Sequence, residues 1–123
     1  MQIIKLKNNQ LTNKQLKTII DSLEKEELII YPTETCYGLG ADATNKKAVT
    51  KVLEFKGSRK GEPISVAVSD LKMAKKFVKI NKIAKNLYDN FLPGPITVIS
   101  QSLHKVDPRV ESERGTLGIR VPD

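Results

Sequence analysis

Apolar residues recur along the chain at helical spacing in four segments, each preceded by a residue that caps helices well. The first segment follows Thr12, which forms a capping-box pattern with Gln15. The others follow Asn45, Ser69 or Asp70, and Asn81. The apolar faces predicted to point inward are Leu16, Ile19, Ile20 and Leu23; Ala48, Val49, Val52, Leu53 and Phe55; Leu71, Ala74, Phe77 and Val78; and Ile83, Ala84, Leu87, Tyr88 and Phe91.

Compact apolar runs between these segments predict strands. The runs cover residues 28–31, 64–68, 96–99 and 117–121, and a weaker alternation at 2–6 suggests an edge strand. The run 28–31 is continuous enough for a buried strand, whereas 101–115 is polar and is expected to be a surface loop. Strands that alternate with helices predict an α/β fold with a mixed sheet, in one domain covering residues 1–123.

Composition narrows the possible functions. The chain has 123 residues and no apolar run near the roughly 20 residues that a membrane span requires, so no membrane partner is expected. Its single cysteine excludes an internal disulfide and fits a cytoplasmic location. The net charge of +7 favours anionic partners such as nucleotides or RNA, although a lysine-rich solvated surface is the simpler interpretation of most of these charges.

The stretch 28–40 holds the densest candidate chemistry. Pro32 ends the apolar strand, two hydroxyls then surround a carboxylate, and glycines follow. A strand that breaks into small polar groups is typical of ligand sites in open α/β sheets, and the alternative is a tight polar turn between two strands. The residues concerned are Thr33, Glu34, Thr35, Tyr37, Gly38 and Gly40.

Common catalytic sites are missing from the sequence. It lacks a nucleoside-triphosphate P-loop, His104 is its only histidine and is expected to be exposed, and Cys36 is interpreted as a small packing residue. The remaining groups are the hydroxyls of Thr33 and Thr35, the cations Lys56 and Arg59 where a helix ends, and Arg120. These groups suit a phosphate-bearing molecule and a small carboxylate, with catalysis by positioning and charge neutralisation rather than by a nucleophile.

Arg120 has two interpretations from sequence alone. Apolar neighbours in Leu117–Val121 place it in a strand, where a buried arginine needs a carboxylate or phosphate partner. The alternative is an outward-facing arginine on a half-exposed strand.

Five segments together resemble the YrdC-like threonylcarbamoyl-AMP synthase family: 31–43, 56–57, 62–66, 93–97 and 118–122. The resemblance implies a twisted open sheet of parallel and antiparallel strands with flanking helices around a positively lined cavity. It implies a nucleotidyltransferase that makes threonylcarbamoyl-AMP and diphosphate from L-threonine, bicarbonate and ATP with Mg²⁺. The product would pass to a separate transferase complex that forms threonylcarbamoyladenosine in tRNA.

The resemblance also assigns site residues. Thr33 and Arg120 would bind L-threonine, and Lys56, Arg59 and Thr116 would bind ATP. A supporting loop set comprises Thr35, Tyr37, Gly38, Ser58 and Pro63, with no protein ligand assigned to the metal. Two departures stand out, because the family usually reads Lys-x-Arg where this chain has Ser58 before Arg59, and a basic residue where it has Glu62.

The family continues beyond the Arg-Val-Pro-Asp segment that ends this sequence, so the resemblance covers the N-terminal two-thirds of the family domain. We therefore expect a domain truncated at its C-terminal end. Two other functions stay open: a non-catalytic module that binds double-stranded RNA or tRNA by phosphate contacts, and an inactive fragment of the synthase.

Overall fold

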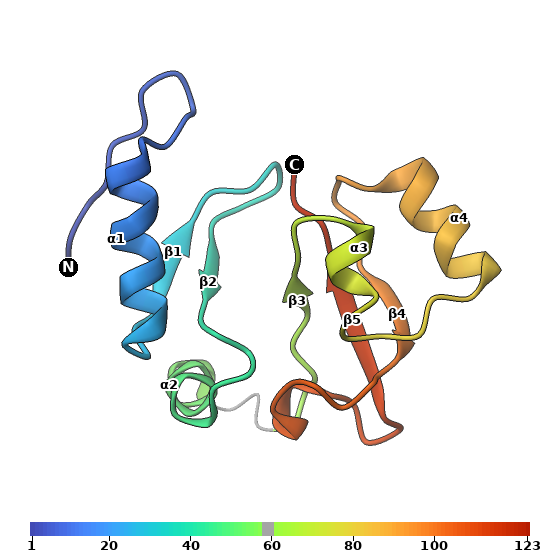
Figure 1. Cartoon of the computed structure of the whole chain (residues 1–123). Helices are drawn as coiled ribbons and strands as arrows, with labels where there is room; N and C mark the ends of the chain where they lie inside the picture. The colour runs from blue at the N-terminus through green and yellow to red at the C-terminus, as the bar shows by residue number, and fades with distance from the viewer. Residues whose placement is uncertain (58–60) are drawn as a thin grey trace.

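The computed structural model describes residues 1–57 and 61–123, which form two sheets with helices around them (Figure 1). Strands β1 (Ile29–Tyr31) and β2 (Gly38–Gly40) pair antiparallel as one sheet. The other has the order β3-β5-β4, in which β3 (Val66–Ala67) is parallel and β4 (Val98–Gln101) antiparallel to the central β5 (Thr116–Arg120). The predicted mixed α/β class is confirmed.

The helices begin where their caps predicted. Thr12 and Gln15 form the complete capping box of α1 (Asn13–Glu24), and Asn45 caps α2 (Lys46–Lys56). Asp70, rather than Ser69, caps the short α3 (Leu71–Ala74), and Asn81 caps α4 (Lys82–Phe91). Each cap side chain accepts hydrogen bonds from amides of the first turn, which have no partner inside the helix.

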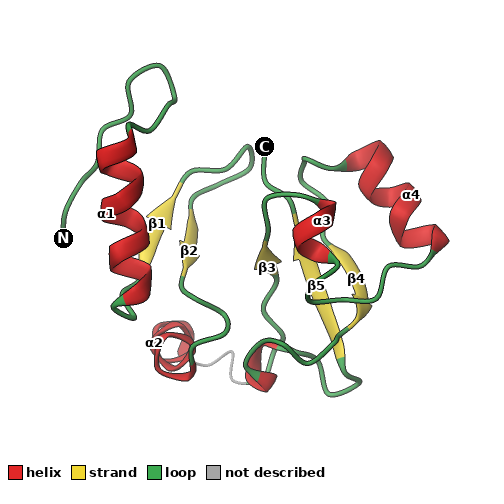
Figure 2. Cartoon of the chain, in the orientation of Figure 1, coloured by secondary structure: helices red, strands yellow, loops and turns green. Residues whose placement is uncertain are grey.

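The helices divide between the two sheets (Figure 2). Helix α1 packs beside β1, and α2 lies at one end of the β1–β2 pair. Helices α3 and α4 accompany the three-stranded sheet, and α4 contacts β4. The C-terminus lies beside the loop that joins β1 to β2, where the Asp123 amide bonds to the Glu34 carboxylate.

The hydrophobic core forms around the three-stranded sheet and includes residues of α2, α3 and α4. Leu117 and Ile119 of β5 are fully buried, and Val98 of β4 lies beside them. Ala48 is the first buried residue along the described chain. The remaining core residues are Val49, Val52, Val68, Ala74, Val78, Ala84, Tyr88, Val106, Val110 and Val121.

Several residues predicted to point inward are exposed. Ile30 is 64% exposed, so the prediction of a buried strand at 28–31 is wrong, because β1 belongs to a two-stranded sheet with α1 as its helical neighbour. Phe55, Ile83 and Phe91 are also largely exposed. Their helices carry apolar stripes wider than the surface that the neighbouring elements cover.

The predicted strand and loop boundaries also changed. Residues 2–6 are irregular, which contradicts the edge strand, and the predicted strands 64–68 and 96–99 are observed as Val66–Ala67 and Val98–Gln101. The segment 101–115 is more than a surface loop. It includes the 3₁₀ helix η2 (Pro108–Val110), and it buries Ser102, Val106, Asp107 and Val110. Across the described residues, the helices are too short or too polar to cross a membrane.

Candidate functional site

The loop between β1 and β2 is a tight turn organised by the hydroxyl of Thr33. Thr33 Oγ1 accepts from the amides of Thr35 and Cys36, each at 3.3 Å, and donates to the Cys36 carbonyl at 2.6 Å. The Thr33 amide also donates to that carbonyl at 3.2 Å. The polar-turn interpretation is therefore correct locally, and the turn presents Glu34 and Thr35 at its tip.

The glycines of this stretch accommodate an aromatic ring. Tyr31 pairs with Gly38 across the β1–β2 sheet, and a Cβ on Gly38 would lie 2.8 Å from Tyr31 Cζ. A Cβ on Gly40 would lie 2.9 Å from Tyr31 Cε1. Real Cβ atoms avoid such distances, so packing alone accounts for both glycines. Tyr37, by contrast, is 75% exposed.

Arg120 ends β5 on the face opposite the buried Leu117 and Ile119. Its Nη2 donates to Thr35 Oγ1 at 3.0 Å and to the Glu34 carboxylate, and its Nε donates to the Gly94 carbonyl at 3.3 Å. Only 21% of the side chain is exposed, so the outward-facing alternative is wrong. The carboxylate partner that a covered arginine requires is Glu34.

Glu34 is a functional candidate to which the sequence assigned no role of its own. Its Oε1 accepts from Arg120, and its Oε2 accepts from the Asp123 amide at 2.7 Å. The ion pair joins residues 86 positions apart, so no local spacing could have revealed it. Together Glu34 and Thr35 join the turn to the end of β5.

The residues predicted to bind ATP lie away from this cluster. Lys56 ends α2, which lies at the opposite end of the molecule from the β1–β2 turn (Figure 1). Thr116 begins β5, four residues and about 13 Å from Arg120 along the strand, and its hydroxyl is 2.6 Å from Ser112 Oγ. Pro63 is exposed, and the predictions for Ser58 and Arg59 lie outside the described residues.

A second set of polar contacts joins the 3₁₀ helix η2 to α2. Arg109 donates to Thr50 Oγ1 at 2.9 Å and to the Lys46 carbonyl at 2.8 Å, while the buried carboxylate of Asp107 holds its guanidinium. The hydrogen bond from Arg109 lowers the pKa of Asp107, although burial opposes the shift. Sequence reasoning missed these contacts, for which the signal was a turn-forming Asp-Pro-Arg segment within 101–115.

The other reactive side chains considered from the sequence are His104 and Cys36. His104 is exposed as expected, with its ring nitrogen 2.9 Å from Glu111. Cys36 is also exposed, so its interpretation as a packing residue is wrong. Within residues 1–57 and 61–123, no group of three His, Cys, Asp or Glu side chains is arranged to hold a metal ion.

A surface pocket of about 400 Å³ lies between α4 and β4. Ile83, Leu87 and Ile99 supply apolar walls, and Thr116 is the predicted site residue that lines it. Thr33 and Arg120 are not among its lining residues. This pocket therefore differs from the cluster around Arg120.

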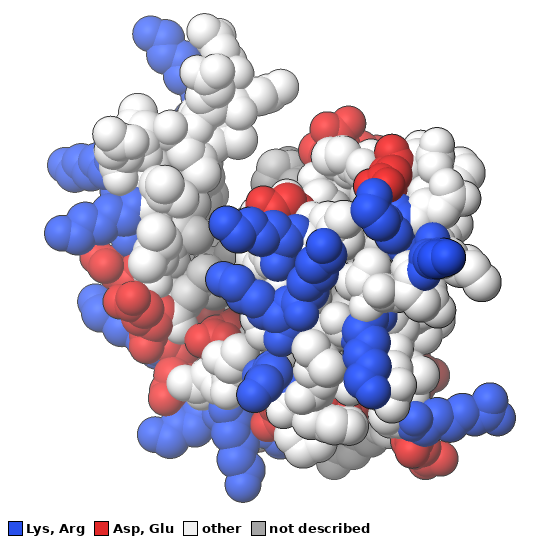
Figure 3. Space-filling model, turned by 45° about the vertical axis from the view of Figure 1, so that its right-hand side comes forward, with Lys and Arg blue, Asp and Glu red and all other residues white. Residues whose placement is uncertain are grey.

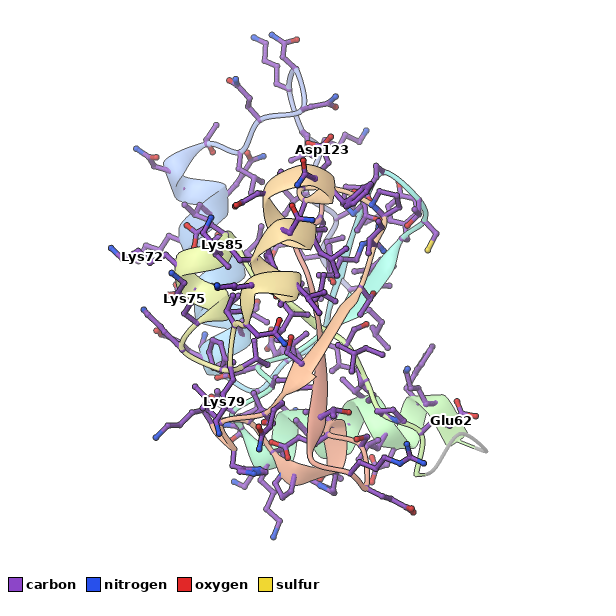
Figure 4. The ribbon with its side chains drawn as sticks, turned by 90° about the vertical axis from the view of Figure 1, so that its right-hand side faces the viewer. Glu62, Lys72, Lys75, Lys79, Lys85 and Asp123 are labelled. Carbon is purple, nitrogen blue, oxygen red and sulfur yellow. The ribbon has the colours of Figure 1, made fainter. Side chains whose placement is uncertain are left out.

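Lysines gather on the face that carries α3 and α4 (Figure 3). Residues 70–89 contain six lysines and two aspartates, an excess of four positive charges out of the chain's net +7. All six lysines are exposed, namely Lys72, Lys75, Lys76, Lys79, Lys82 and Lys85. Four of them lie along one side of the molecule and Glu62 lies on the other (Figure 4). We call these six residues the lysine face.

The fold and the cluster define a mixed α/β domain with an arginine at the C-terminal end of its central strand. Residues 21–123 match the family model Sua5_yciO_yrdC, described as "Telomere recombination", and the chain belongs to this family. A Bacillus subtilis protein named threonylcarbamoyl-AMP synthase is 37% identical over 103 residues, which are 82% of this chain and 30% of that protein.

Solved structures agree with this assignment. The structure of Pyrococcus abyssi Sua5 complexed with L-threonine superimposes with a TM-score of 0.85 at 26% identity, covering 93% of this chain and 34% of that one. E. coli YciO shares the fold, with a TM-score of 0.83 at 24% identity over 93% of this chain and 56% of that one. The chain spans 58%, 30% and 51% of the lengths of the first three curated relatives that it matches.

Proposed function

We propose that this chain forms threonylcarbamoyl-AMP and diphosphate from L-threonine, bicarbonate and ATP, for threonylcarbamoyladenosine modification of tRNA. The observation that carries the proposal is Arg120, whose fork lies at the C-terminal end of β5 against Glu34 and Thr35. This position suits the carboxylate of a small ligand, with the Thr33 hydroxyl 3.1 Å from that of Thr35. The names of the B. subtilis and P. abyssi relatives support the choice of substrate.

The proposed reaction needs no protein nucleophile. Bicarbonate and the amine of threonine first form a carbamate with loss of water. A carbamate oxygen then attacks the α-phosphorus of ATP, the bond from that phosphorus to the bridging oxygen breaks, and diphosphate leaves. The protein supplies position and charge, in that Arg120 holds the threonine carboxylate and Lys56 and Arg59 offset phosphate charge.

The separation between the two groups of residues agrees with a two-part ligand. Arg120 ends β5 and Thr116 begins it, so an amino acid at one end and a nucleotide at the other would lie along the same strand. Mg²⁺ would enter with ATP as its substrate complex and would supply charge neutralisation at the phosphates.

The test is diphosphate release by the chain with all three substrates, and with each omitted in turn. We expect release that requires threonine, bicarbonate and ATP together, with the adenylate identified by mass spectrometry. Release that continues without threonine would contradict the proposal. Calorimetric titration with threonine alone reports binding independently of turnover.

The lysine face favours a second candidate function, the binding of double-stranded RNA or tRNA. Lysines that neutralise phosphates release counterions, so affinity should fall steeply with salt. Reversal of Lys72, Lys75, Lys79 and Lys85 to Glu should weaken tRNA binding and reduce the salt slope by about 0.9 for each phosphate that is no longer neutralised. A matched control reverses four exposed lysines around α1, namely Lys5, Lys7, Lys14 and Lys17. Equal effects of both sets would indicate a general charge effect and contradict a defined RNA surface.

A further inference from the structure

Opposite charges lie side by side in the cluster at the end of β5, and both are within reach of a ligand. Glu34 and Arg120 form an ion pair in which 23% and 21% of the respective side chains remain exposed. An α-amino acid carries the same two charges, a carboxylate and an ammonium, on adjacent atoms. The pair therefore offers one complementary group to each end of such a ligand.

We propose that Glu34 binds the ammonium group of the amino acid while Arg120 binds its carboxylate. The inference rests on the proposed function in so far as it takes threonine as the amino acid. Glu34 thereby becomes a specificity residue, because it distinguishes an amino acid from the same acid without its amine.

The contacts around the pair allow this exchange with little rearrangement. The Glu34 carboxylate is anchored through Oε2 by the Asp123 amide, and the Arg120 guanidinium is anchored through Nε by the Gly94 carbonyl. When a ligand carboxylate takes Arg120 Nη2, Glu34 Oε1 becomes available to an ammonium. One internal ion pair is thus replaced by two ion pairs to the ligand, so neither charge loses its partner.

The neighbouring hydroxyls add a contact for the rest of the ligand. Thr35 Oγ1 lies 3.0 Å from Arg120 Nη2 and 3.1 Å from Thr33 Oγ1. The Thr33 hydroxyl is committed to the turn, since it donates to the Cys36 carbonyl and accepts from two amides. Thr35 is therefore the hydroxyl that is better placed to meet a ligand group beside the carboxylate.

The charge on the ligand nitrogen changes during the reaction, and this change restricts the proposed role of Glu34 to binding of the free amino acid. Carbamate formation first requires the ammonium to release a proton to solvent, because only the neutral amine attacks. The nitrogen thereby loses its positive charge and gains a carboxylate beside it. The attraction between Glu34 and that nitrogen then ends. Substitution of Glu34 should accordingly change the dissociation constant for the free amino acid.

Two ligands measured on two proteins test the proposal. Threonine and 3-hydroxybutyrate, which is threonine without its amine, are titrated by calorimetry into the unmodified chain and into Glu34→Gln. We expect Glu34→Gln to weaken threonine binding about tenfold to a hundredfold, because a charge-assisted contact is lost. It should leave 3-hydroxybutyrate unchanged or tighter, because the carboxylate that competes for Arg120 is gone.

A purely structural role for Glu34 predicts a different pattern. If Glu34→Gln weakens both ligands by the same factor, Glu34 only positions Arg120 and the proposal is wrong. If the unmodified chain binds no amino acid, the proposal is also wrong. Threonine binding without diphosphate release would contradict the proposed reaction alone. Glu113→Gln, at an exposed position, is the matched control, and thermal unfolding of each variant verifies the fold.

Discussion

The ring of Tyr31 lies directly over Gly38, its partner across the β1–β2 sheet, and leaves no space for a Cβ on that glycine. Gly38→Ala should therefore displace the ring and destabilise the fold by about 1–3 kcal/mol, as overpacking does. Denaturant unfolding measures the effect. Combining Gly38→Ala with Tyr31→Leu should recover part of the loss, since the two residues couple directly. Additive losses in the double variant would contradict this contact.

Lys56 is predicted to offset the charge of the ATP phosphates at the end of α2. Lys56→Ala should weaken the binding of ATP by about 1.5–3 kcal/mol, or tenfold to a hundredfold, and should leave threonine binding nearly unchanged. Calorimetric titration with each ligand separates the two effects. Lys47→Ala, on an exposed position of the same helix, serves as the control. Unchanged ATP affinity in Lys56→Ala would refute the assignment.

Arg120→Lys keeps the positive charge but removes the planar fork that contacts Glu34, Thr35 and Gly94. We expect a loss of threonine affinity of at least about 1.5 kcal/mol. Titration with threonine measures it, with the exposed Arg114→Lys as the control. If Arg120→Lys binds threonine as tightly as the unmodified chain, the guanidinium does not hold the carboxylate.

Asp107 should make stability depend on acid pH. The hydrogen bond from Arg109 lowers the pKa of Asp107 in the folded chain, so unfolding at low pH takes up a proton. This stabilisation is fully present above about pH 4, the ordinary range of an aspartate, and is lost as pH falls towards the lowered pKa. Asp107→Asn should flatten that part of the profile of unfolding free energy against pH. An unchanged profile would rule out Asp107 as its source.

Tyr88 should make the stability of the fold depend on pH in the alkaline range. Burial raises the pKa of Tyr88 to about 12, and among the described residues its hydroxyl has no hydrogen-bond partner. Above about pH 10 the unfolded chain ionises while the folded chain does not, so stability falls as pH rises. Tyr88→Phe should remove this fall in stability at alkaline pH. At pH 7 the free energy of unfolding of the variant should be equal to that of the unmodified chain or higher by up to about 1 kcal/mol. Denaturant unfolding at pH 7 and pH 10.5 compares the variants.

Local signals predicted the helices well because caps act within one turn. Thr12, Asn45 and Asn81 each bond to amides two or three residues ahead, and their sequence context contains that information. The exposure of Phe55 and Ile83 depends on which other elements cover the helix. Helical periodicity carries no information about that partner, so the extent of the buried face was predicted too broadly.

The candidate site, like the helices, was predictable from sequence only in part. Arg120 could be identified as a candidate because a charge inside an apolar strand requires a partner. The identity of that partner could not be predicted. Glu34 lies 86 residues away, and Arg109 reaches Thr50 across 59 residues. Such contacts follow from the tertiary fold, which brings the β1–β2 turn and η2 against elements that are distant in sequence.

The position of the first buried residue, Ala48, has a consequence for how the molecule opens. The segment before it holds α1, β1 and β2, and polar contacts through Glu34 and Thr35 help to attach it to the rest of the chain. Cooperative units with little apolar burial open at lower free energy than the global transition. Native-state amide exchange should therefore resolve two populations, with the amides of α1 and β1 exchanging through a subglobal opening and those of β5 only through complete unfolding. A ligand that spans Glu34 and Arg120 would slow exchange in the first population, so protection of α1 amides would report occupancy of a site that α1 itself does not contact.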